Sequence, residues 1–162
     1  MNTPLVRSIL RAVLVIPFLV GGMLTAGWAQ SANSYENRIV GVFDVQVTLY
    51  NCDTGAPFAS FRGLNKFELG GTAQVVPATN PTALSAHVGI WNHVQGNNYE
   101  LAFKMFRFDG AGNNIGWQIV RFDLVTNDDA TLYAGSGVSK VYDSSGNLIG
   151  RSCPTIAGTR FE

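Results

Sequence analysis

Apolar and polar residues alternate with a period of two over most of the chain after residue 37. In the first such stretch, for example, Val45 and Val47 flank the polar Gln46. Alternation of this kind is typical of a half-buried β-strand, and no helical periodicity competes with it. The pattern predicts strands over 38–50, 58–69, 72–76, 84–94, 99–108, 115–125, 130–142, 148–152 and 155–161.

Short segments rich in Gly, Asn, Asp and Pro separate these stretches, including 51–57, 95–98, 109–114 and 143–147. Turns this short join neighbouring antiparallel strands. The sequence therefore predicts an all-β, up-and-down antiparallel meander of eight or nine strands. An open meander would leave two unpaired edges, so we expect it to close into a single barrel. A two-sheet β-sandwich is the alternative.

The N-terminal residues have a different character. Arg7 and Arg11 precede an apolar run that ends at small residues near Ala29, which is typical of a cleaved secretory signal helix. A permanent membrane anchor is the alternative, but the run falls just short of the ~20 residues that a spanning helix needs. We expect a signal peptide over 1–29, a flexible leader over 30–37 and a β-barrel domain over 38–162.

Charge excludes one class of partner. The chain carries 11 Lys and Arg against 11 Asp and Glu, and the basic residues are spread singly. Nucleic-acid binding therefore lacks electrostatic support. We expect a secreted or periplasmic protein with no membrane contact after cleavage of the signal.

The two cysteines, Cys52 and Cys153, are predicted to form a disulfide, because a secreted chain folds in an oxidising compartment. Cys52 follows the first expected strand, and Cys153 precedes the last. If the first and last strands pair antiparallel, these two positions become neighbours. A closed barrel therefore predicts the disulfide, and the disulfide predicts closure.

His87 and His93 lie on one face of one expected strand, six positions apart. That spacing is about 20 Å, which is too far for a shared metal ion. We predict no metal site. Packed or rim histidines are one reading, and polar groups that line a ligand cavity are the other.

Seven residues are candidates for contact with a ligand in the barrel. They are His87, Trp91, Tyr99, Phe103, Arg107, Trp117 and Arg121. Aromatic side chains fill small barrels in any case, so simple packing is the competing explanation. Arg107 continues the face of Tyr99 and Phe103, and Arg121 continues the face of Trp117. Both faces are apolar between Phe103 and Leu124, so the pattern leaves the inward face of that region open.

If Phe103 points inward, Phe106 and Phe108 point outward. Exposed aromatic side chains in a row indicate an interface, either with a second copy of the chain or with another partner. We therefore expect possible homo-oligomers through Phe106 and Phe108.

The segments HVGIWNHVQGNNYELAFKMFRFDGAGNNIG, VYDSSGNLIG and GTRFE resemble small secreted bacterial β proteins with a calycin-like barrel, distantly similar to lipocalins and to allene oxide cyclase. The resemblance covers most of 42–162. Lipocalins carry Gly-x-Trp on their first strand, whereas here Gly89 and Trp91 lie in mid-chain. No cyclase catalytic residue matches a position of this chain, and fold analogy alone does not assign function.

No catalytic or cofactor motif is present in the sequence. The leading hypothesis is a barrel that binds a small apolar or amphipathic ligand in its lumen, with no cofactor. An isomerase or cyclase is the second hypothesis, and it would require His87, Arg107 or Arg121 to be buried beside an open cavity. A structural or interaction protein, with Phe106 and Phe108 as the contact, is the third.

Overall fold

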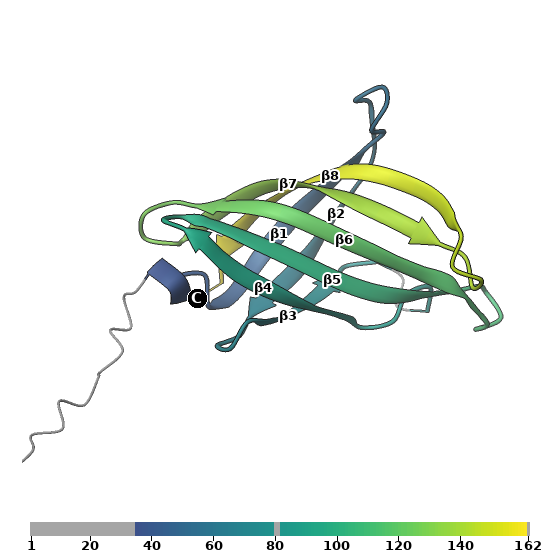
Figure 1. Cartoon of the computed structure of the whole chain (residues 1–162), viewed down its shortest axis with the longest axis horizontal. Helices are drawn as coiled ribbons and strands as arrows, with labels where there is room; N and C mark the ends of the chain where they lie inside the picture. Colours follow the sequence, from purple (N-terminus) through teal and green to yellow (C-terminus); the bar gives the residue numbers. More distant parts are fainter. Residues whose placement is uncertain (1–34, 80–81, 162) are drawn as a thin grey trace, which may run out of the picture.

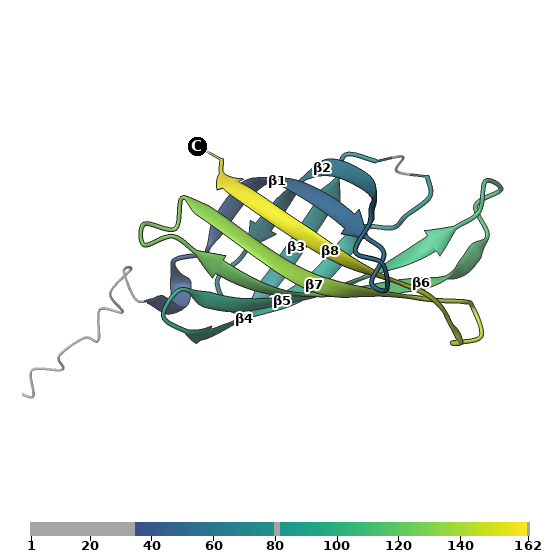
Figure 2. The ribbon, with the colours of Figure 1, turned by 90° about the horizontal axis from the view of Figure 1, so that it is seen from above.

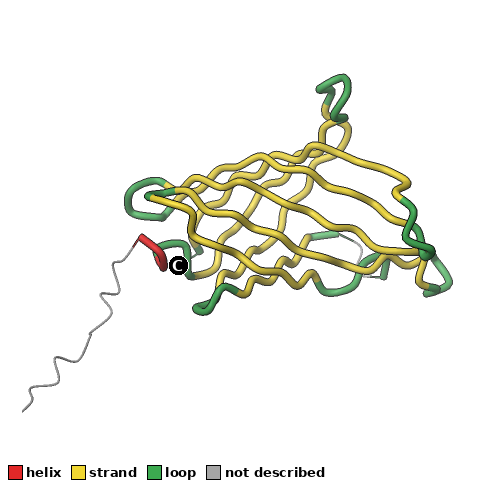
Figure 3. The backbone as a smooth tube through the Cα atoms, in the orientation of Figure 1, coloured by secondary structure: helices red, strands yellow, loops and turns green. Residues whose placement is uncertain are grey.

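The computed structural model describes residues 35–79 and 82–161, and the expected signal peptide lies outside these residues. The described chain is all-β apart from one short 3-10 helix (Figures 1 and 3). The elements, in chain order, are η1 (Tyr35–Asn37), β1 (Gly41–Tyr50), β2 (Pro57–Phe67), β3 (Thr72–Pro77), β4 (His87–Gln95), β5 (Asn98–Phe108), β6 (Asn114–Thr126), β7 (Leu132–Tyr142) and β8 (Leu148–Arg160).

The eight strands form a closed antiparallel barrel in which each strand pairs with its neighbours in the sequence. Closure is made by β1 and β8, which run side by side from Phe43 opposite Arg160 to Tyr50 opposite Cys153 (Figure 2). The predicted up-and-down barrel is therefore confirmed, and the sandwich alternative is wrong. Pairing β1 with β8 leaves the sheet without a free edge.

Eight strands rather than nine make the barrel, because 148–152 and 155–161 belong to one strand, β8. The two expected strands stop on either side of Cys153 and Pro154, and Pro154 cannot donate to a β-ladder. The structure accommodates it where the ladder between β7 and β8 is interrupted. The pairs there pass from Ser136–Thr155 directly to Ser139–Ser152, and the register is the same on both sides.

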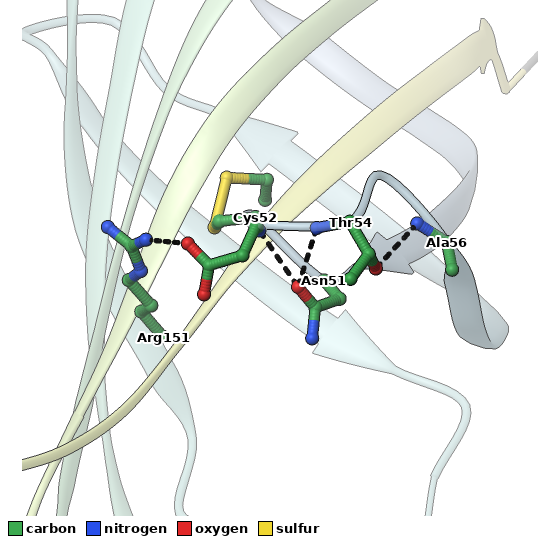
Figure 4. Close-up of a disulfide and its surroundings, with 7 residues drawn as sticks. Asn51, Cys52, Thr54, Ala56 and Arg151 are labelled. Atoms are coloured by element: carbon green, nitrogen blue, oxygen red, sulfur yellow. Dashed lines mark hydrogen bonds and ion pairs between the residues drawn. A yellow bond between two sulfur atoms is a disulfide. The ribbon is translucent and has the colours of Figure 1, made fainter.

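The predicted disulfide between Cys52 and Cys153 is present, with Cα atoms 5.1 Å apart and a sequence separation of 101 (Figure 4). It ties the turn after β1 to β8. Asp53, beside Cys52, forms an exposed ion pair with Arg151 of β8. The Asn51 side chain accepts hydrogen bonds from the backbone N–H groups of Asp53 and Thr54, at 2.8 and 3.0 Å. The turn is thus held both covalently and by its own polar groups.

The half of the barrel nearest η1 is filled with aromatic side chains. Phe43, Phe67 and Tyr133 meet edge to face, with ring centroids 5.0 to 5.8 Å apart. Trp91 packs at 6.3 Å from Phe67, and Tyr99 lies 6.1 Å from Trp91. All five are buried. Edge-to-face packing of aromatic rings adds stability beyond the burial of their area, so this half is a solid core.

Arg160 closes that end of the barrel. Its guanidinium donates to the backbone carbonyls of Val40, Arg38 and Ala130 at 2.6 to 2.9 Å. The same group lies 4.7 Å from the ring centroid of Phe43. One side chain of the last strand thereby ties down the chain before β1 and the loop before β7.

Candidate functional site

The opposite half of the barrel holds a cavity of about 160 Å³. Its wall is mainly aliphatic and aromatic, with side chains from every strand of the barrel. Val47 of β1, Phe103 of β5 and Val120 of β6 are examples. No charged side chain is among the described residues that line it. The cavity begins where the aromatic core ends, so the core forms its floor.

Strict alternation along the strands turns these side chains inward. On β5, Tyr99, Leu101, Phe103 and Met105 are buried, whereas Glu100 and Lys104 are exposed. The first two contribute to the core, and the last two line the cavity. A single strand therefore serves both halves of the barrel.

His87 is the first residue of β4, and its side chain is 4% exposed. Its ring stacks on Phe103, with centroids 5.7 Å apart and planes 10° from parallel. Neither ring nitrogen has a hydrogen-bond partner among the described residues. Burial disfavours the charged imidazolium and lowers the pKa of His87 to about 4. The ring is therefore neutral at pH 7, and His87 forms part of the wall of an apolar cavity.

Asn65 of β2 is the second polar group of the wall, and it is 1% exposed. Its Nδ2 donates to the Tyr133 hydroxyl at 2.8 Å, while its Oδ1 has no partner in the described part of the chain. Burial raises the pKa of Tyr133, so that phenol stays protonated. Polar groups buried at such depth are normally satisfied, so the unpaired Oδ1 of Asn65 is an exception within the described residues.

Gln118 of β6 and Ser139 of β7 add a third polar feature. The Gln118 Nε2 donates to the Ser139 hydroxyl at 2.6 Å across the two strands. Both residues line the cavity. The hydrogen bond between them satisfies part of their hydrogen-bonding capacity, whereas His87 and Asn65 keep unpaired polar atoms.

A second depression, of about 380 Å³, adjoins the cavity at β3 and β4. The ladder between these strands is short and ends at the pair Val75–His87. Val75, Leu84 and His87 belong to the walls of both spaces. His87 thus stands between the lumen and a concave surface at the point where the two strands separate.

The seven sequence candidates are distributed over four places. His87 and Phe103 line the cavity. Trp91 and Tyr99 point inward but belong to the packed half. The Trp91 indole donates to the Glu68 carbonyl at 2.9 Å, and the Tyr99 hydroxyl donates to the Tyr35 carbonyl. Arg107 is half-buried near the opposite end of β5 and does not line the cavity.

Trp117 and Arg121 lie on the outer face of β6 and do not line the cavity, and this answers the face assignment that the sequence left open. Val120 and Phe122, which alternate with them, are buried instead. The sequence could not decide this, because both faces of β6 are apolar. The Trp117 ring stacks on Tyr142 at 5.7 Å, and the ammonium group of Lys104 lies 4.9 Å from its centroid. This outer aromatic contact explains an apolar residue on the solvent side.

Asn65, Gln118 and Ser139 are wall residues that the sequence analysis missed. A signal for Asn65 exists, since it shares the alternation of Phe61 and Phe67 and is a polar residue on an otherwise apolar face. Gln118 and Ser139 carry no comparable signal, because their strands do not show which face is buried.

Two further kinds of feature are absent from residues 35–79 and 82–161. This part of the chain has no group of three or more His, Cys, Asp or Glu side chains placed to hold a metal ion. Within the same residues, no helix has the length and apolar character needed to cross a membrane.

Comparison with known proteins assigns neither a family nor a function to the chain. No family model matches the chain, and no curated protein matches it. Among solved structures, the crystal structure of Rv2717c from M. tuberculosis aligns over 77% of this chain and 94% of that chain. The sequence identity is 10% and the TM-score is 0.39. This likeness is too distant to assign a family or a function to the chain.

Proposed function

We propose that the protein binds a small apolar or amphipathic molecule in the lumen of its barrel. The observation that carries this proposal is the cavity of about 160 Å³ with an apolar wall and a neutral, unpaired His87. Ligand sites of proteins are concave and mostly apolar, with a few placed polar groups that fix orientation. A packed structural barrel has no need for such a space, since protein interiors are otherwise close-packed.

The depression outside β3 and β4 supports the same function. It reaches His87 from the other side and shares Val75 and Leu84 with the cavity. Few backbone hydrogen bonds join the two strands here, because their ladder has only four pairs. Entry of a ligand at this point would break fewer ladder bonds than entry elsewhere in the wall.

A filled-cavity variant tests the proposal. Val120→Phe adds a ring to the wall of the cavity, whereas Val138→Phe adds the same ring to the outer face, where Val138 is 43% exposed. We expect toluene to bind the native protein and Val138→Phe, and not Val120→Phe, in ligand-observed NMR. Native mass spectrometry of protein purified from its own host should show a retained small molecule. If toluene does not bind and no molecule is retained, the proposal is refuted.

An isomerase or cyclase activity is the second candidate function. The burial of His87 beside the cavity favours it, because a neutral imidazole can accept a proton from a bound molecule. Conversion of the retained molecule by the native protein, and loss of that conversion in His87→Gln, would support catalysis. Recovery of the molecule unchanged after prolonged incubation would leave binding alone.

Two further properties belong to this proposal. The disulfide supports an extracytoplasmic protein, since such bonds persist in oxidising compartments. A calycin-like affiliation belongs to the same proposal and is supported by the closed eight-stranded up-and-down barrel. Appearance of the disulfide-bonded chain, cut near residue 29, in a periplasmic or culture-medium fraction would test the location.

A further inference from the structure

The polar groups of the cavity indicate which kind of molecule it accepts. Asn65 and His87 lie on one lateral row of the sheet, because Asn65 pairs with Val75 and Val75 pairs with His87. Two strand spacings, about 10 Å, separate their backbones. Both residues line the cavity. A single small molecule between them can therefore meet both side chains.

The unmet hydrogen bonds of these two residues are of different kinds. Asn65 uses its amide N–H on Tyr133, so its free group is the acceptor Oδ1. Neutral His87 offers one N–H donor and one acceptor nitrogen, and neither is used. A ligand can meet His87 in either role. Asn65, in contrast, requires a ligand that donates a hydrogen bond.

The absence of charge on the described cavity wall and the volume of the cavity narrow the class of ligand further. Since no charged side chain lines the described wall of the cavity, a bound carboxylate or ammonium group would lose its hydration without gaining a partner of opposite charge. A volume of about 160 Å³ suits one small ring, since an engineered cavity of about 150 Å³ in another protein binds benzene.

Water alone fits the cavity less well. A buried water molecule normally makes two to four hydrogen bonds, and a space of this size would hold about five at liquid density. The polar groups of the wall, mainly Asn65, His87 and the mutually bonded Gln118 and Ser139, are too few for so many. One ring with one polar group matches a mostly apolar wall better.

We propose, building on the binding function above, that the ligand is a neutral, ring-sized molecule with a hydroxyl or N–H donor, of the phenol or indole kind. Its donor meets Asn65 Oδ1, its polar end lies within reach of His87, and its ring lies against the apolar wall. Phe103, on which His87 stacks, belongs to that wall.

Four probes of similar size separate the possibilities: phenol, toluene, benzaldehyde and benzoate. Phenol donates a hydrogen bond, benzaldehyde only accepts one, toluene does neither, and benzoate is an anion. We expect calorimetry and ligand-observed NMR at pH 7 to show phenol binding about tenfold more tightly than toluene or benzaldehyde, because only phenol satisfies the buried acceptor. Benzoate should bind most weakly.

A pair of matched variants locates the preference. Asn65→Leu removes the acceptor at nearly constant size, and Asn92→Leu makes the same change on the exposed outer face of β4. We expect the preference for phenol over toluene to vanish in Asn65→Leu, with toluene still bound, and to persist in Asn92→Leu. Circular dichroism reports whether Asn65→Leu folds. If it does not, the four probes on the native protein still decide the question.

The outcomes separate the two proposals. Equal affinity for phenol and toluene, or tightest binding of benzoate, would overturn the ligand class and leave binding in the lumen standing. Failure of all four probes to bind would overturn the ligand class, and it would overturn both proposals if the protein from its own host also retains no small molecule. Persistence of the preference in a folded Asn65→Leu would overturn the role given to Asn65.

Discussion

The burial of an unpaired His87 predicts that the protein loses stability in mild acid. Protonation of the imidazole in the folded state would place a charge in an apolar wall. The pKa of His87 is lowered by burial from 6.5 to about 4, whereas the unfolded chain titrates near 6.5. The folded pKa is therefore the lower of the two. Stability is fully present above pH 6.5 and is lost as the pH falls from 6.5 towards 4, because the unfolded state binds the proton first.

The size of the effect follows from these two values. Between pH 7.5 and pH 5 the free energy of unfolding should fall by about 2 kcal/mol, and by about 3 kcal/mol once the pH is below 4, at 1.36 kcal/mol per unit of pKa difference. Glu68, Asp109, Asp129 and Asp143 have pKa values lowered from starting values of 3.8 to 4.5 by hydrogen bonds. The stability that these four carboxylates contribute to the folded state is lost mainly below pH 5.

Urea unfolding at intervals of half a pH unit, with the disulfide intact, measures this slope. His87→Gln should flatten the curve between pH 7.5 and 5, even if the variant is less stable overall. His93→Gln is the matched control, since His93 lies on the same strand and its Nε2 is 2.9 Å from the Gly96 carbonyl oxygen. The His93→Gln variant should keep the native fall in the free energy of unfolding between pH 7.5 and 5. A native protein whose stability does not change in this window, or an unchanged slope in His87→Gln, would refute the reasoning.

Three further outcomes are expected. Replacing Cys52 and Cys153 by alanine should cost 2 to 5 kcal/mol in denaturant unfolding, about the value for a long loop, and the native protein should show no free thiol in a thiol titration. Gly158→Ala should cost about 1 to 3 kcal/mol, because its Cβ would lie 2.4 Å from the Tyr133 ring; full native stability would contradict this packing. Phe106, which is 45% exposed, is proposed as a self-association contact, so Phe106→Ser should shift sedimentation towards the monomer; a monomeric native protein would remove that proposal.

Turn chemistry and alternation made most of the architecture predictable. Segments such as 109–114 and 143–147 carry Asp, Gly and Asn, and in both the first Asp accepts hydrogen bonds from the turn, as short hairpin loops require. The two cysteines added a long-range constraint that local pattern cannot supply, and it gave the closure of β1 on β8. The division of β8 into 148–152 and 155–161 was wrong, because the interruption of the ladder with β7 leaves the ladder with β1 intact.

The site was less predictable, because its signals depend on which face is buried. Where one face is plainly apolar, as at Phe103, the inward residues could be inferred. Where both faces are apolar, as on β6, the pattern left the inward face open, and the candidates Trp117 and Arg121 lie on the outer face. The roles of Asn65 and His87 depend on bonds that are not made, and an unmet hydrogen bond is a property of the folded chain that no residue pattern shows.

The barrel has a packed half and a half that holds the cavity, and substitutions in the two halves should have different effects. Changes near Phe43 or Tyr133 would disturb close packing on which the whole molecule depends. Changes at Val47 or Val120 would reshape the cavity without disturbing that packing. A library confined to the half that holds the cavity should therefore yield barrels that fold alike and differ in what they accept, which would make this chain a usable scaffold for engineered small-molecule receptors.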